Sequence, residues 1–95
     1  MVDNRYLAQQ LLPEIGVIGQ AKLGSSKVLV IGCGGLAAAV LPYLAAAGVG
    51  FITIIYDDNI ILSNLNRQIL FKDSDLGLNK AVIAKRQLQQ QNPEI

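Results

Sequence analysis

The feature that most constrains this chain is a stretch without charged residues that extends from position 28 to position 56. Because it exceeds the roughly 20 apolar residues that span a bilayer, a transmembrane helix is one interpretation. Five glycines and one proline interrupt the stretch, however, and its ends are rich in β-branched residues while its middle is rich in Ala and Leu. This pattern favours a strand, a glycine turn, a helix, a glycine stop and a second strand, all buried in an α/β sheet whose strands are covered on both faces.

The remainder of the chain extends this order of elements. Pro13 interrupts a first helical segment, and Asn92-Pro93 ends the last helix. The predicted fold is an α/β, Rossmann-like parallel sheet, in which an N-terminal helical segment, 1–26, precedes a βαβα nucleotide-binding unit, 27–95. We expect this sheet to be incomplete, truncated before its third strand, and to leave an apolar edge exposed. The expected strands are 27–32 and 51–56, the expected helices are 4–12, 14–23, 38–47 and 80–90, and 60–79 is expected to be irregular.

Composition excludes several classes of function. Eight Lys and Arg residues against seven Asp and Glu give a net charge of +1, which offers no footprint for nucleic acid. Cys33 is the single cysteine and there is no histidine, so disulfide frameworks, metal sites built on cysteine pairs and Cys-His or Ser-His catalytic pairs are excluded within the chain. We expect Cys33 to be a small buried side chain. The N-terminus lacks the layout of a signal peptide, so we expect a cytoplasmic protein without a membrane partner.

A glycine loop connects the first expected strand to the helix that follows it. Gly32, Gly34 and Ala37 have the spacing G-x-G-x-x-A, which is the dinucleotide-binding fingerprint when it lies between a strand and a helix. Glycines allow close approach of the backbone, and the free N–H groups of the helix favour an anion. Asp57 or Asp58, after the second strand, could hold ribose hydroxyls. The alternatives are a turn that only packs helix on strand, and a solvated turn at the strand end.

Segment 62–68, Leu-Ser-Asn-Leu-Asn-Arg-Gln, has no use in a hydride-transferring Rossmann domain. Together with other motifs in order, it closely resembles the N-terminal part of the E1-like adenylyltransferases, the ThiF, MoeB and HesA group, which are relatives of the ubiquitin-activating enzymes. The resemblance extends from about Arg5 to Ile95. The other motifs are Arg5-Tyr6, Leu-Leu-Pro-Glu-Ile-Gly at 11–16, Gly-Cys-Gly-Gly-Leu at 32–36, Tyr-Leu-Ala-Ala-Ala-Gly-Val-Gly at 43–50 and Gly-Leu-Asn-Lys at 77–80.

The resemblance implies an enzyme that uses Mg-ATP to adenylate the C-terminal glycine of a ubiquitin-like sulfur-carrier protein (MoaD/ThiS-like), as in molybdopterin or thiamin biosynthesis. It implies a homodimer, and a Mg²⁺ ligand that lies outside this chain. Arg67 and Lys80 would be catalytic, placing positive charge beside the phosphates; surface charge is the alternative reading of both. The ATP-binding residues that it implies are Gly32, Gly34, Gly35, Asp57, Asp58, Ser63, Asn64, Arg67 and Lys80.

The chain also departs from the pattern of this family. Tyr56 occupies the position of the family's ribose-binding aspartate, although the acidic position that follows is kept as Asp58, and Asp57 could substitute by a small shift. Ala8 occupies the position of an arginine that reaches the partner subunit's ATP site, for which Arg5 is a possible stand-in. The reaction is therefore expected to be incomplete in this chain. The alternatives are a non-catalytic nucleotide-binding or dimerisation module and, third, a fragment of an NAD-dependent oxidoreductase.

Overall fold

The computed structural model describes residues 4–95 and confirms the predicted α/β order. None of the helices in this part of the chain is long and apolar enough to cross a membrane, and the uncharged stretch is divided among β1, α3 and β2. The elements are α1 (Leu7–Gln10), α2 (Gly16–Ser25), β1 (Lys27–Ile31), α3 (Gly35–Ala47), β2 (Phe51–Ile55), α4 (Lys80–Gln91) and the 3₁₀ turns η1 (Leu62–Asn64) and η2 (Asp73–Asp75).

Two helix starts differ from the prediction by three residues, and the other helix and strand ends differ by two residues or fewer. The first helix is shorter than 4–12, because the Asn4 side chain accepts a hydrogen bond from the backbone N–H of Tyr6 and forms a turn before the helix begins. The helix after the glycine loop begins earlier than position 38. Gly34 is its N-cap, and the carbonyl of Gly34 already accepts from the N–H of Ala38 at 2.9 Å. The glycine loop and the first turn of α3 therefore overlap.

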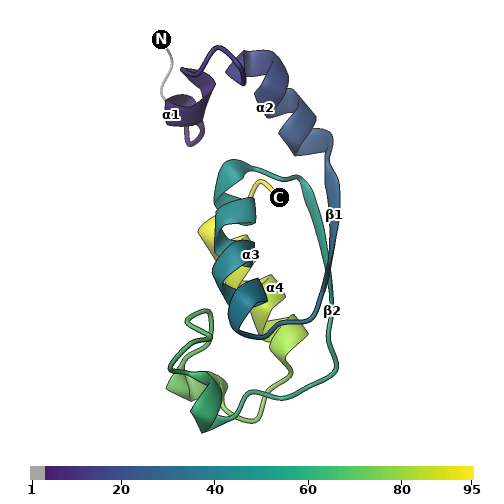
Figure 1. Cartoon of the computed structure of the whole chain (residues 1–95), viewed down its shortest axis with the longest axis vertical. Coiled ribbons are helices and arrows are strands. Elements are labelled where there is room, and N and C mark those ends of the chain that lie inside the picture. Colours follow the sequence, from purple (N-terminus) through teal and green to yellow (C-terminus); the bar gives the residue numbers. More distant parts are fainter. Residues whose placement is uncertain (1–3) are drawn as a thin grey trace.

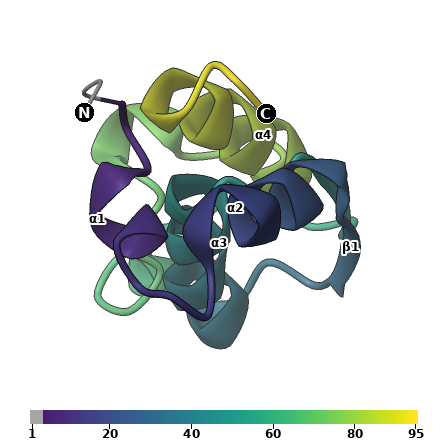
Figure 2. The same ribbon diagram turned by 90° about the horizontal axis from the view of Figure 1, so that it is seen from above.

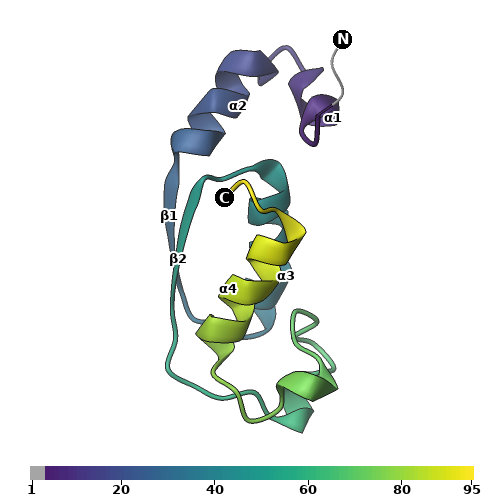
Figure 3. The ribbon, with the colours of Figure 1, turned by 180° about the vertical axis from the view of Figure 1, so that it is seen from behind.

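Strands β1 and β2 form a parallel pair, with α3 as the crossover between them. Lys27 lies opposite Phe51 and Ile31 lies opposite Ile55. Helices α3 and α4 both lie on the same side of this pair (Figure 1 and Figure 3). The carboxyl ends of both strands and the beginnings of both helices therefore meet at one end of the unit, where ligands bind in open α/β sheets.

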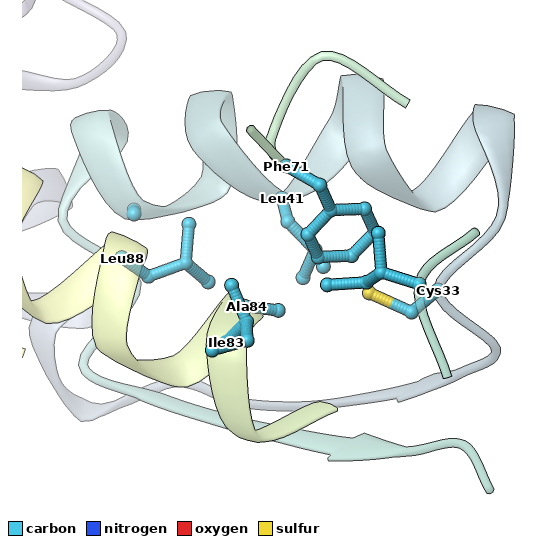
Figure 4. Packing of buried hydrophobic residues seen from close by; sticks show 8 residues of the cluster. Cys33, Leu41, Phe71, Ile83, Ala84 and Leu88 are labelled. Atoms are coloured by element: carbon cyan, nitrogen blue, oxygen red, sulfur yellow. The ribbon is translucent and has the colours of Figure 1, made fainter. Parts of the chain in front are cut away.

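The core lies between the strands and these two helices, and it includes Phe71 from the irregular segment (Figure 4). Cys33 is fully buried there, as predicted. The last helix contributes Ile83, Ala84 and Leu88 to this core, whereas Ala81 is only half-buried.

Within residues 4–95 nothing covers the opposite face of the strand pair, so the expectation of strands covered on both faces is not met in this part of the chain. Leu29, Ile31, Phe51 and Ile55 on that face are 55–79% exposed. A cavity of about 390 Å³ also opens between the outer edge of β2 and α4, lined by Ile52, Thr53, Ile54, Ala81, Val82, Lys85, Leu88, Gln89 and Ile95. The expected exposure of apolar surface is confirmed, and it includes a whole sheet face as well as an edge.

The N-terminal helices lie across the far end of α3 (Figure 2). Gln9 and Gln20 both donate to the carbonyl oxygen of Ala47, at 2.8 and 3.0 Å, and so satisfy the end of the helix. Gly48 ends α3 in the left-handed conformation with φ +89°, as predicted for its C-terminal stop. A side chain at Gly48 would also collide with Gln20 and Tyr6 at 2.7 Å. These contacts attach α1 and α2 away from the loop end of the sheet.

Candidate functional site

The site is built around the glycine loop at the carboxyl end of β1. Gly32 has φ +104°, a conformation that favours glycine, and its N–H donates to the carbonyl of Ile55 at 2.8 Å. Apart from Gly34 itself and its two chain neighbours, no atom of residues 4–95 lies within 4 Å of the place that a Cβ would occupy at Gly34. The backbone is therefore open to a ligand at the point where the first N–H groups of α3 lack helical partners.

Cys33 points away from this opening into the core. Burial raises the pKa of its thiol, and the positive charge of Lys80 partly opposes that rise. A neutral, buried thiol is a poor nucleophile, so Cys33 packs the loop and does not take part in chemistry.

Arg67 is brought to the loop by the irregular segment. The Cγ and Cδ atoms of its side chain lie 3.6 and 3.7 Å from the place of a Cβ at Gly35, so its aliphatic stem rests on the first residue of α3. Its Nη1 donates to the carbonyl oxygen of Ser63 at 2.9 Å and to Asn66 Oδ1 at 3.1 Å. The predicted site residues Gly35, Ser63 and Arg67 therefore lie together.

Asn64 organises this segment. It is 7% exposed, its Oδ1 accepts from the N–H of Ile61 at 3.1 Å, and its backbone carbonyl accepts from the N–H groups of Arg67 and Gln68. Its side-chain oxygen is thus used to close the turn, and its NH₂ group is the part that could donate to a ligand.

The sequence prediction did not assign Gln68 to the site, although Gln68 follows Arg67 directly. Gln68 is 3% exposed, and its Oε1 is buried without a hydrogen-bond partner within residues 4–95. An unpaired buried carbonyl costs about 1–3 kcal/mol, so it marks a place where a donor is missing. Only its presence in the motif 62–68 could have pointed to it.

Lys80 is drawn to the ends of the strands by pairing between 58–60 and 77–80. Its N–H donates to the carbonyl of Asp58 at 2.9 Å, and the Asn79 side chain caps α4 by accepting from Val82. The Lys80 side chain is only 3% exposed; its Nζ lies 3.5 Å from Asp58 Oδ2 and 5.2 Å from the centre of the Tyr56 ring. The site therefore holds a buried cation with a mostly exposed carboxylate as its acidic partner.

The two acidic residues after β2 are placed differently. Both are exposed, and Asp58 is the one whose carboxylate lies beside Lys80. Tyr56 packs against the core, and its ring lies 4.0 Å from the place of a Cβ at Gly32. The structure thus brings Asp58 and Tyr56 to the loop, and Asp57 is not among the residues that it gathers there.

Arg5, the possible stand-in for the arginine missing at Ala8, is engaged within its own chain. Its Nε lies 2.7 Å from Glu94 Oε2, and its Nη1 donates to the carbonyl of Gln91 at 3.3 Å. These contacts hold Arg5 at the C-terminal end of α4.

No group of three or more Asp, Glu or Cys side chains that could hold a metal ion occurs in the described part of the chain. Asp58 is committed to Lys80 and, through Oδ1, to the N–H of Asn59. These residues do not fit a Mg²⁺ site by themselves.

Taken together, the end of the sheet presents helix N–H groups, a guanidinium and a buried ammonium. All of these groups attract anions, and phosphate is the anion that such glycine loops cradle.

Comparisons with known proteins agree with this geometry. The chain matches the ThiF family over residues 6–95. The sulfur carrier protein adenylyltransferase of Thermus thermophilus is 44% identical over 90 residues, which are 95% of this chain and 33% of that protein. The sulfur carrier protein ThiS adenylyltransferase of Escherichia coli is 47% identical over 91 residues, 96% of this chain and 36% of that protein. The chain thus spans about a third of the length of these curated relatives.

Solved structures show the same relationship. The crystal structure of Escherichia coli MccB with ATP matches with a TM-score of 0.89 and 39% identity, and it covers 100% of this chain and 29% of that one. The structure of MccB with AMPCPP and MccA matches with a TM-score of 0.91. The chain therefore belongs to the ThiF family.

Proposed function

We propose that this chain supplies the ATP-binding part of an adenylyltransferase that activates the C-terminal glycine of a ubiquitin-like sulfur-carrier protein of the MoaD or ThiS type. In this reaction a carboxylate oxygen of the carrier attacks the α-phosphorus of ATP, the bond from that phosphorus to the bridging oxygen breaks, and pyrophosphate leaves. The relatives are named as adenylyltransferases of sulfur carriers, which supports the reaction type. We assign to this chain only the nucleotide side of the reaction.

The contact between Arg67 and Gly35 is the observation that carries this proposal. It holds a permanently charged guanidinium beside the free N–H groups at the beginning of α3. Both kinds of donor are fixed before a nucleotide arrives, so they can stabilise charge that moves onto the departing pyrophosphate without reorganisation. The remaining donors of the guanidinium are available, because the bonds to Ser63 and Asn66 both use Nη1.

Lys80 adds a point charge beside the Tyr56 ring at the end of β2. Its acidic partner Asp58 is 56% exposed, so a phosphate that approaches Lys80 competes with a solvated carboxylate. Asn64 and Gln68 line the same segment with an amide donor and an orphaned oxygen, and Ser63 contributes the carbonyl that orients Arg67.

The setting of this reaction is also part of the proposal. Mg²⁺ would be held by ligands beyond those that residues 4–95 supply. A homodimer is also part of the proposal; it comes from the resemblance to the family, and the bare sheet face is not assigned to it. A cytoplasmic location is supported by Cys33, a buried and unpaired thiol.

Carrier-dependent exchange of labelled pyrophosphate into ATP tests the proposal, in the longest natural form that contains this chain. Arg67→Ala should lower the exchange rate by about 100-fold or more, because removal of one preorganised donor at a developing charge typically costs this much. Lys85→Ala removes one exposed positive charge on α4 and should leave the rate unchanged. An Arg67→Ala protein that is folded and exchanges at the native rate would exclude this role for the site.

The second candidate is a nucleotide-binding module that does not adenylate. Tyr56 at the strand end and the engagement of Arg5 by Glu94 favour it, because both remove groups that a complete site would use. It predicts that ATP binds without pyrophosphate exchange and that Arg67→Ala leaves function in the cell intact. Calorimetric titration with ATP and NADH separates both candidates from an NAD-dependent oxidoreductase, which would prefer NADH.

A further inference from the structure

The end of β2 is the place where a nucleotide-binding βαβ unit normally carries a carboxylate for the ribose. Side chains alternate along a strand, so residues two apart share a face. Tyr56 packs against the same core as Ile54, whereas Asp57 is exposed in the same manner as Ile55. Tyr56, not Asp57, therefore occupies the position that faces the glycine loop and α3.

The contacts of Tyr56 fix it in that position. Its ring touches the loop at Gly32, 4.0 Å from the place of a Cβ, and lies below the Lys80 ammonium, 5.2 Å from the ring centre. A cation over an aromatic face is attracted without transfer of charge to the ring. The Tyr56 side chain is thus held between the loop and the cation.

Asp58, the carboxylate that faces Lys80 beside this group, is already engaged. Oδ1 of Asp58 accepts from the N–H of Asn59 at 2.8 Å, and Oδ2 lies 3.5 Å from Lys80 Nζ. A sugar at the loop would therefore meet a neutral phenol rather than a free carboxylate. A phenol forms one neutral hydrogen bond, whereas a carboxylate can accept two charge-assisted bonds that are about twice as strong.

We propose that Tyr56 determines sugar specificity at the nucleotide site, and that the site discriminates weakly between ribose and deoxyribose. The inference rests on the proposed function, because it concerns the same ATP site. Loss of a hydroxyl from the nucleotide leaves no buried charge unpaired here, and it is an unpaired buried group that gives a site strong selectivity. A nucleoside triphosphate that lacks one ribose hydroxyl should therefore bind almost as well as ATP.

Calorimetric titration with ATP, 2′-deoxy-ATP and 3′-deoxy-ATP tests this inference in the longest natural form of the chain. We expect the Kd of each deoxynucleotide to exceed that of ATP by less than about tenfold in the native protein, the range of one neutral hydrogen bond. Tyr56→Asp should raise the ratio at least threefold above the native ratio, because it restores a charged acceptor. Tyr43→Asp makes the same substitution at an exposed site on α3 and should leave the ratio unchanged.

The outcomes separate this inference from the proposed function. A native Kd ratio of tenfold or more overturns the inference while the proposed function stands. If Asp57→Asn then abolishes that high ratio, Asp57 is the residue that binds the ribose hydroxyls. An unchanged ratio in a folded Tyr56→Asp protein also overturns it. Should Tyr56→Asp fail to fold, the native ratio still decides, and Tyr56→Phe, which keeps the ring, should reduce the ratio to about one. If no ATP binds at all, the proposed function fails, and the inference fails with it.

Discussion

Gly50 lies where the chain leaves α3 and enters β2, and its replacement by alanine tests how tightly this turn packs on the end of α2. A Cβ at Gly50 would overlap the carbonyl oxygen of Gly24 and approach the carbonyl carbon to 2.7 Å. Both atoms belong to the backbone, so no change of rotamer can relieve the overlap. The helix end and the turn would have to separate.

The cost of that separation follows from the bonds at the turn. The N–H of Gly50 donates to the carbonyl of Leu23, and the N–H of Phe51 donates to the carbonyl of Ser26, each at 3.1 Å. Loss of each bond costs about 1 kcal/mol net, and overpacking costs about 1–3 kcal/mol more. We expect Gly50→Ala to lower the free energy of unfolding by about 3–5 kcal/mol, a large share of the 5–15 kcal/mol typical of a domain.

Urea unfolding followed by circular dichroism measures this change, with two glycines of open surroundings as controls. Apart from neighbouring residues in the chain and the backbone of its own helix, nothing in the described part of the protein lies within 4 Å of a Cβ at Gly24 or Gly77. Gly24 lies in α2, so alanine there should raise stability by up to about 1 kcal/mol. Gly77 has φ +83°, so alanine there should cost about 1–2 kcal/mol through conformation alone. A cost at Gly50 no greater than at Gly77 would refute the packing argument.

Three further expectations concern single residues. Burial raises the pKa of the Cys33 thiol, although the charge of Lys80 opposes this, so the folded chain keeps the thiol proton at a pH where the unfolded chain loses it. The free energy of unfolding should therefore fall as pH rises above about 8.5. Urea unfolding across a pH series measures this fall, and Cys33→Ala should flatten it. Ile31→Lys, on the bare sheet face, should raise the soluble fraction without lowering the unfolding midpoint, and a lower midpoint would show that the face is covered. The buried Asn92 amide donates to the carbonyl of Ala45 at 2.8 Å. Asn92→Ala should therefore lower the free energy of unfolding in urea by about 2–3 kcal/mol. Gln89→Ala, at an exposed position on α4, should lower it by less than about 0.5 kcal/mol.

Local signals were sufficient to predict the βαβ unit. The backbone has positive φ at two stops, Gly32 after β1 and Gly48 after α3, and few residues other than glycine adopt this conformation. The β-branched runs between such stops predict strands, and their parallel order follows from the helix between them. The prediction made α1 too long, because the Asn4 side chain accepts from the N–H of Tyr6 and forms a turn that competes with the helix. Helix propensities do not include such a side-chain hydrogen bond.

The arrangement of the site depends on contacts between distant parts of the chain. The resemblance to a family assigned Arg67 and Gly35 to one ATP site, but neither the resemblance nor any periodicity in the sequence predicted the contact between them. The burial of Lys80 needs the pairing of 77–80 with 58–60, which no local pattern encodes. Tyr56 differs in this respect. When the alternation of side chains along β2 is continued by one residue, Tyr56, and not Asp57, lies on the side of the sheet that faces the glycine loop.

The chemistry of the proposed reaction agrees with the kinds of groups that the site contains. Its nucleophile is an α-carboxylate with a pKa of about 3.3–3.7, so it is ionised at neutral pH and needs no base to remove a proton. The barrier comes instead from an anion that approaches a polyanionic phosphate and from charge that collects on the leaving group. Donors and cations lower such a barrier, and this chain places the N–H groups of α3, Arg67 and Lys80 at one end of the sheet. The chain contains no histidine, and for this step none is required.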